Sequence, residues 1–216
     1  MGGLNLLAFL IAVFYLPEIS HRKKTTSSRP SFKKMRTSGM VKGLFSFRLA
    51  FSLGRGSFAA FLSILAGIYI SLSPALIGVL LTVNMLLTSL LQVYSGNIAD
   101  RFNRRALVVV GSLISFTYLA LIPLGNNFWQ LLTICALGGL GGAISMPSAS
   151  ALTVEEGRKF GMGSTIAVFT MAMSISMAIG PIVAGAIADF INISSVFYFS
   201  AAMGLIGTSL FIWFTK

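Results

Sequence analysis

Long apolar stretches alternate with short polar connections along most of the chain. Six of them have about 20 residues each, the length that an α-helix needs to cross the hydrocarbon core of a bilayer. Backbone N–H and C=O groups in hydrocarbon must be paired within their own segment, so each stretch is predicted to be a helix. The predicted spans are 45–70, 75–95, 106–124, 128–148, 163–188 and 194–214. The predicted fold class is therefore all-α, a polytopic transmembrane helical bundle.

Two further stretches precede these spans. Residues 2–16 are apolar but short for a span, and no positive charge precedes them as it would in a signal peptide. Residues 17–43 are rich in Ser, Thr, Lys and Arg, which is typical of a flexible linker. This linker either serves as a solvated determinant of topology or docks on anionic lipid. We expect a partial transmembrane helix (1–16), a basic cytoplasmic loop (17–43) and a six-helix transmembrane bundle (44–216).

The amino-acid composition indicates that most of this chain lies in a lipid bilayer. Hydrophobic residues make up 56% of it and charged residues only 10%, whereas a soluble domain carries about 25% charged residues. The formal net charge of +11 does not indicate nucleic acid as a partner. Eight of the 16 Lys and Arg residues lie within 22–42, and most others flank apolar stretches. That distribution is typical of a membrane protein.

The connections alternate in charge, and this predicts the orientation. Connections 17–43, 100–105 and 155–159 hold nearly all the cations, whereas the turns near Pro74, Asn126 and Asn192 contain no Lys or Arg. Cytoplasmic loops of membrane proteins are enriched in Lys and Arg. We therefore expect a multi-pass protein of the cell membrane (plasma or inner), with residues 17–43 and the C-terminus in the cytoplasm.

Few residues in this sequence could support catalysis or metal binding. Cys135 is the one cysteine and His21 the one histidine, so neither a metal cluster nor a nucleophile–base pair is indicated. A glycine-rich phosphate-binding loop is also missing from the sequence. We expect no cofactor, no metal and no enzymatic activity. None of the five acidic residues falls in the middle of a predicted span, so a proton-coupling carboxylate would have to lie outside this chain.

Residues 96–105, at the end of the second predicted span, form the most informative motif. Gly96 and Asp100 are four residues apart and share one helix face. Glycine there permits close approach of another helix, and Asp100 could accept hydrogen bonds from the free N–H groups at that helix's N-terminus. Three cations follow at positions that suit the cytoplasmic end of a helix: Arg101, Arg104 and Arg105.

This run, G-N-I-A-D-R-F-N-R-R, resembles the signature loop of the major facilitator superfamily, roughly G-x-x-x-D-R-x-G-R-R. Asn103 replaces the second glycine, and asparagine tolerates left-handed turn geometry better than most residues. Segments 16–18, 146–152 and 179–186 also resemble the family, in matching order. The resemblance implies the C-terminal half of such a transporter, namely the end of helix six plus helices seven to twelve. An N-terminal half is the alternative register, which the basic stretch before the spans disfavours.

The first predicted span is the one that carries charges. Arg48 lies near its cytoplasmic edge, where its side chain can snorkel to water. Arg55 lies about 15 Å further in than the start of the span, near the midplane, and shares a face with Ser52. Arg55 therefore either binds an anion or gates the pathway, or it pairs with a carboxylate elsewhere. The functional reading favours an anionic or amphiphilic small molecule.

Polar stripes on two other spans are further candidates for the wall of a transport pathway. Helix–helix hydrogen bonding is the structural alternative for each of these side chains. The Gly180–Pro181 pair should bend its span, and the glycine run at 138–142 should allow close helix packing. Counting the first span, the predicted pathway residues are Ser52, Arg55, Asn84, Thr88, Gln92, Thr170, Ser174 and Met177.

The resemblance implies secondary active transmembrane transport of a small molecule, such as efflux or metabolite exchange, by an alternating-access carrier of two six-helix halves. This chain would be one half, or a fragment, and its partner a missing N-terminal half. Two alternatives remain: a half-size carrier that acts as a homodimer, and a non-transporting membrane scaffold or assembly protein.

Overall fold

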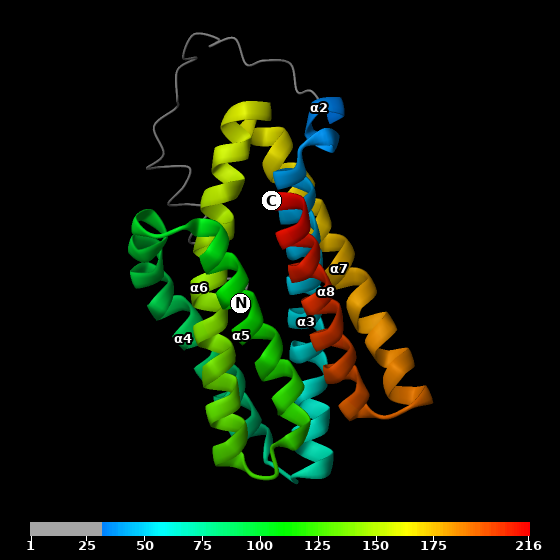
Figure 1. Ribbon diagram of the computed structural model, residues 1–216. Helices are drawn as coiled ribbons and strands as arrows, with labels where there is room; N and C mark the ends of the chain where they lie inside the picture. Colours follow the sequence, from blue (N-terminus) through cyan, green and yellow to red (C-terminus); the bar gives the residue numbers. More distant parts are fainter. Residues whose placement is uncertain (1–31) are drawn as a thin grey trace, which may run out of the picture.

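The computed structural model describes residues 32–216, which form long helices running roughly parallel or antiparallel to one another (Figure 1). Six of these helices are long and apolar enough to cross a membrane, and the described residues contain no strand. The predicted all-α polytopic bundle is confirmed. The predicted partial helix 1–16 and most of the basic loop lie outside the described residues. The elements are α2 (Phe32–Thr37), α3 (Gly39–Tyr69), α4 (Pro74–Arg101), α5 (Arg104–Leu121), η1 (Ile122–Leu124), α6 (Phe128–Phe160), α7 (Met162–Phe190) and α8 (Ile193–Thr215).

Several helices extend beyond their predicted spans at the end that carries the cations. α3 begins at Gly39 rather than 45, so residues 39–43 belong to a helix and not to the loop. α4 continues to Arg101, and α6 continues to Phe160, well past the predicted end at 148. Pro147 lies within α6 without ending it. Hydropathy detects only the apolar part of a helix. These helices continue beyond it through polar residues at the cation-rich end, so the predicted spans are too short.

Most of the long helices have a side-chain cap at their N-terminus, and these capping residues mark where each connection ends and the next helix begins. Ser73, Asn127 and Asn192 each accept a hydrogen bond from a backbone N–H of the first turn. Asn103 does the same for α5, accepting from the N–H of Arg105 at 3.0 Å with a φ of −63°. Asn103 thus replaces the glycine of the family motif as a helix cap, without adopting left-handed geometry. Gly161, with a φ of 103°, is the left-handed residue that joins α6 to α7.

The helices differ widely in how much of their surface the bundle covers. α3 packs mainly against α8 and α7, and 67% of the residues in its 18-residue apolar stretch are buried. α6 packs between α4 and α5. By contrast, only 11% of the residues in the equivalent apolar stretch are buried in α4, and 22% in α7. These two helices lie at opposite sides of the bundle (Figure 1) and leave large apolar and polar surfaces uncovered within this chain.

Small residues bring α5 and α6 into close contact. A Cβ atom on Gly141 would lie 2.7 Å from the backbone N of Ser115 and 2.9 Å from the O of Gly111. A Cβ on Gly139 would lie 2.9 Å from the O of Asn84, at the contact of α6 with α4. The predicted close packing of the 138–142 glycine run is confirmed. A Cβ on Gly180 would lie 3.6 Å from the O of Leu53 on α3, and the bend expected at Pro181 stays a prediction.

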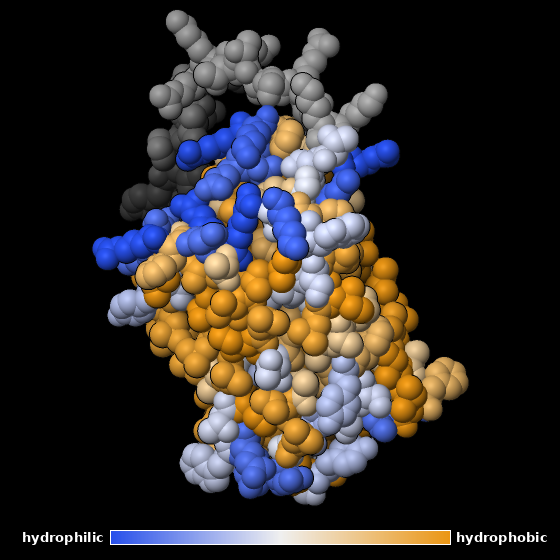
Figure 2. All heavy atoms as spheres, viewed as in Figure 1, coloured by the Kyte–Doolittle hydropathy of each residue, from blue (hydrophilic) through white to orange (hydrophobic). Residues whose placement is uncertain are grey.

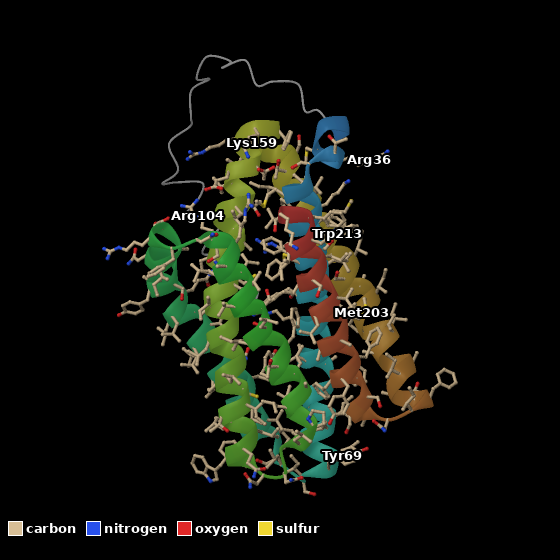
Figure 3. All side chains as sticks on the ribbon, viewed as in Figure 1. Arg36, Tyr69, Arg104, Lys159, Met203 and Trp213 are labelled. Atoms are coloured by element: carbon tan, nitrogen blue, oxygen red, sulfur yellow. The ribbon has the colours of Figure 1, made fainter. Side chains whose placement is uncertain are left out.

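The ends of the bundle differ in charge from its middle. Hydrophobic residues cover the central part of the visible face, and hydrophilic side chains gather at its ends (Figure 2). Arg36, Arg104 and Lys159 lie at one end, and Tyr69 lies at the other (Figure 3). The chain is thus built as an integral multi-pass membrane protein. Which end faces the cytoplasm stays a prediction from the positive-inside rule.

The α5–α6 contact gives a stability prediction. Gly141→Ala should lower the thermal stability of the detergent-solubilised protein by the equivalent of about 1–3 kcal/mol, because the new methyl group would overlap backbone atoms of α5. The matched control is Gly185→Ala in α7, where a Cβ meets no atom within 4 Å. That change should be neutral or stabilising by up to about 1 kcal/mol. Equal melting curves for the two variants would contradict the close contact.

Candidate functional site

The candidate site is built around two arginines that occur within the apolar helix α3. Arg48 and Arg55 are seven residues apart, about two turns, and therefore lie on the same side of α3. Arg48 is about 14 Å and Arg55 about 24 Å along the axis from Gly39. Among the described residues, neither arginine takes part in an ion pair. Charges so placed in a membrane helix mark a functional surface by default.

The Arg48 side chain turns into the bundle instead of snorkelling outward. Its Nη2 donates to Oγ of Ser150 at 3.1 Å, and its Nη1 lies 3.9 Å from Sδ of both Met146 and Met173. Its Nε is buried without a hydrogen-bond partner. The side chain therefore contacts α6 and α7 instead of using the snorkelling that its position allows, and α6 continues beyond it to Phe160.

A cavity of about 230 Å³ opens beside Arg48, between α3, α6 and α7. Its walls combine one cation and three hydroxyl groups with apolar side chains. The lining residues are Arg48, Ser150, Thr153, Val154, Ile166, Phe169, Thr170 and Met173. Two larger grooves, of about 390 and 400 Å³, lie elsewhere at the cation-rich end and contain none of the predicted pathway residues.

Arg55 lies on the rim of a much smaller polar cavity, toward α4, α5 and α6. Its volume of about 20 Å³ holds about one water molecule. Asn84 donates from Nδ2 to the O of Cys135 at 2.9 Å, and Thr88 Oγ1 lies 3.3 Å from the O of Gly139. These two side chains therefore link α4 to α6, which is the structural alternative considered for them. Ser115 Oγ, also at this cavity, is buried without a partner.

The other predicted pathway residues separate into buried and exposed positions. Ser52, a predicted pathway residue, is only 6% exposed and lies inside the bundle, because α3 is covered on most sides. Thr170 is exposed and lines the Arg48 cavity, whereas Ser174 and Met177 are exposed on α7 outside it. Gln92 is exposed on α4. Arg55 is itself exposed.

The signature loop forms an ion-pair network with the end of α6. Arg104 pairs with Asp100 at 3.0 Å and with Glu155, and its Nε donates to the O of Ala99. Asp100 was expected to bind the N-terminus of another helix, but within the described residues its side chain pairs with Arg104 and is 72% exposed. Gly96 has no atom within 4 Å of a Cβ position, so no described helix approaches it closely.

The remaining loop cations face outward or join α8. Arg105 donates from Nη1 to the O of Thr215 at 2.5 Å, which ties the start of α5 to the end of α8. Arg101 is exposed at the end of α4.

Glu156 is an ordered acidic residue that sequence reasoning missed. Its side chain is 4% exposed and accepts hydrogen bonds from Lys159 Nζ at 2.7 Å and from Ser38 Oγ at 3.1 Å. The spacing to Lys159 was readable as an i, i+3 pair. Ser38 lies 118 residues earlier in the chain, so no local pattern could reveal that partner. The contact joins the end of α6 to the N-cap of α3.

Six membrane-length apolar helices with cations gathered at one end of the bundle define a polytopic integral membrane protein. Residues 44–216 match the sequence model of the Major Facilitator Superfamily, and the chain belongs to this family. The family resemblance of the sequence is thereby confirmed.

Related proteins match a shorter part of the chain. A protein named Multidrug resistance protein MdtH from Yersinia enterocolitica serotype O:8 / biotype 1B is 31% identical over 111 residues, which are 51% of this chain and 28% of that protein. A protein of the same name from Yersinia pestis (strain Pestoides F) is 31% identical over 107 residues, 50% of this chain and 27% of that protein. The matches thus span less than a third of these relatives' length.

The buried carboxylate gives a second prediction. Glu156→Gln should lower the free energy of unfolding in mixed micelles by about 1–3 kcal/mol, because a buried charge-assisted hydrogen bond and an ion pair are lost. Glu155→Gln is the matched control, since that side chain is 48% exposed and its pairing with Arg104 should contribute about 0–1 kcal/mol. A larger loss for the Glu155 variant would contradict the role assigned to Glu156.

Proposed function

We propose that this chain forms one wall of the pathway of an alternating-access carrier, which moves a small molecule across the membrane by secondary active transport. In this proposal a second six-helix half, absent from this chain, faces α3, α4, α6 and α7. Substrate passes between the two halves, as in carriers built from repeats.

The uneven burial of the helices is the observation that carries the proposal. α4 and α7 are the two least covered spans, and α7 carries polar side chains, Thr170 and Ser174, on its exposed surface. Gln92 is exposed on α4 in the same way. Exposed polar residues are costly against lipid and favourable against water or protein. A partner bundle that encloses an aqueous path would satisfy them.

Family membership supports the transport role, and the relatives suggest its direction. The curated relatives are named multidrug resistance proteins, which favours efflux of small amphiphilic molecules for this chain. Arg55, near the middle of α3 and exposed, supports an anionic or amphiphilic substrate. Asp100 and Arg104 in the signature loop would then contact the partner half when the cytoplasmic side closes.

Two other arrangements would use the same surfaces. A homodimer of this chain would supply the second half by a twofold axis. A membrane scaffold would bury the α4 and α7 surfaces against another protein without a water-filled path. The exposure of Arg55 favours the two transport arrangements, because a guanidinium sealed in a dry interface without a carboxylate is unfavourable.

Cysteine accessibility tests the pathway. In a Cys135→Ala background, cysteines placed by Arg55→Cys and Ser174→Cys should react with a membrane-impermeant maleimide in native membranes, because both positions would face water. Leu205→Cys on α8, at an exposed apolar position, should stay unreactive in lipid. Position 55 unreactive from both sides of the membrane would favour the scaffold.

Two differently tagged copies, expressed together, separate the transport arrangements. We expect the tags not to copurify, because the leading arrangement pairs this chain with a different half. Copurification at equal amounts from native membranes would contradict that expectation and identify the homodimer.

A further inference from the structure

The Arg48 guanidinium lacks a counter-charge within the part of the chain that the structure describes. Its Nε is buried and unpaired, and its Nη1 faces two thioether sulfurs, which are weak acceptors. The acidic groups nearest that end are engaged elsewhere. Asp100 and Glu155 pair with Arg104, and Glu156 pairs with Lys159. Asp189 lies near the end of α7, at the opposite side of the bundle's apolar zone.

The hydroxyl groups around Arg48 are arranged to complement an anion. Ser150 Oγ accepts from Arg48, so its own proton is free to donate to a ligand oxygen. Thr170 Oγ1 lines the same cavity and is on the exposed side of α7. A carboxylate or sulfonate suits this site because it can accept N–H bonds from the two Nη groups of Arg48, while Nε stays enclosed by the protein.

Apart from Thr153, whose hydroxyl donates to the O of Ala149, the rest of the cavity wall is apolar. Phe169, Ile166 and Val154 line the space of about 230 Å³ that opens from the guanidinium. Pockets that bind small molecules combine such walls with a few polar groups that fix orientation. The arrangement therefore suits a ligand with an acidic group at one end and an apolar body.

We propose that Arg48 and the cavity between α3, α6 and α7 bind the acidic group of a soluble amphiphilic organic anion. This inference rests on the proposed transport role and gives that role a substrate class. Arg48 holds the acidic group, Ser150 donates a further hydrogen bond to it, and the apolar body packs against Phe169 and Ile166. Arg55, farther along the same side of α3, attracts the anion without being part of this cavity.

The test is equilibrium binding of 2-naphthoate and of its neutral analogue 2-naphthamide. The protein is purified from its membranes with any copurifying bundle and placed in phosphatidylcholine nanodiscs. The native protein should prefer naphthoate, and Arg48→Gln should weaken naphthoate binding by about tenfold or more, the effect expected from a lost charge-assisted hydrogen bond. Naphthamide binding should stay unchanged. Ser150→Ala should weaken naphthoate binding by a smaller factor.

Arg101→Gln is the matched control, because Arg101 is an exposed cation at the same end of the bundle and outside the cavity. Unchanged naphthoate binding in Arg48→Gln would overturn the proposal, and so would an equal loss in Arg101→Gln, which would indicate general surface charge. Loss of naphthoate binding when phosphatidylglycerol is added would overturn the assignment to a soluble anion and indicate a lipid headgroup. If a carboxylate of another half paired with Arg48, the preference for naphthoate would persist in Arg48→Gln. That result would also overturn the proposal.

Failure of this inference differs from failure of the transport role. If naphthoate binding does not depend on Arg48 while position 55 stays accessible to maleimide, the proposed transport role stands and the proposed anion site at Arg48 fails. If position 55 is sealed but naphthoate still depends on Arg48, the site binds an anion without transporting it.

Discussion

Hydrocarbon solvates neither a peptide group nor a guanidinium, and most features of this bundle follow from that constraint. The peptide groups are paired within six long helices. Lipid gives helices little hydrophobic reason to associate, so α5 and α6 approach through Gly111, Gly141 and Ser115 until their backbones nearly touch. Arg48 cannot be satisfied in the same way, because hydroxyl and thioether groups surround it and no described carboxylate pairs with it. The helices thus satisfy the peptide groups of the backbone. A counter-charge for Arg48 would have to come from a ligand or another protein.

The cation-rich end is organised by a different balance of forces. There Glu156 is buried and fully engaged, holding the N-cap of α3 to the end of α6, while Arg104 joins α4, α5 and α6 at the water side. Exposed pairs contribute little to stability and are easily exchanged. In the proposed carrier Asp100, with a largely exposed side chain, would therefore be able to exchange Arg104 for a partner on the second half. A stable buried contact beside an exchangeable exposed one suits a surface that opens and closes.

The spans and the signature loop could be predicted from sequence because each depends on local properties: apolar length, turn residues and the spacing from Gly96 to Asp100. The helix ends could not, because α3 and α6 continue through polar residues that hydropathy assigns to loops. Periodicity placed Ser52 and Arg55 on one stripe, yet Ser52 is buried and Arg55 exposed, since neighbouring helices cover one flank of that stripe. Asn84 and Thr88 were recognised as polar, but whether they face water or α6 depends on which helix packs beside them. Glu156 with Ser38, and Arg48 with Ser150, join residues far apart in the chain.

In the proposed carrier the α7 surface beside the Arg48 cavity faces a second helical bundle across a transport pathway. A photo-crosslinking amino acid placed at Met177, which is 51% exposed on α7, tests this directly in native membranes. The same group at Ile206, 53% exposed on α8, is the control for contact with lipid. We expect a protein adduct from position 177 and none from position 206. Equal adducts from both positions, or none from position 177, would contradict it.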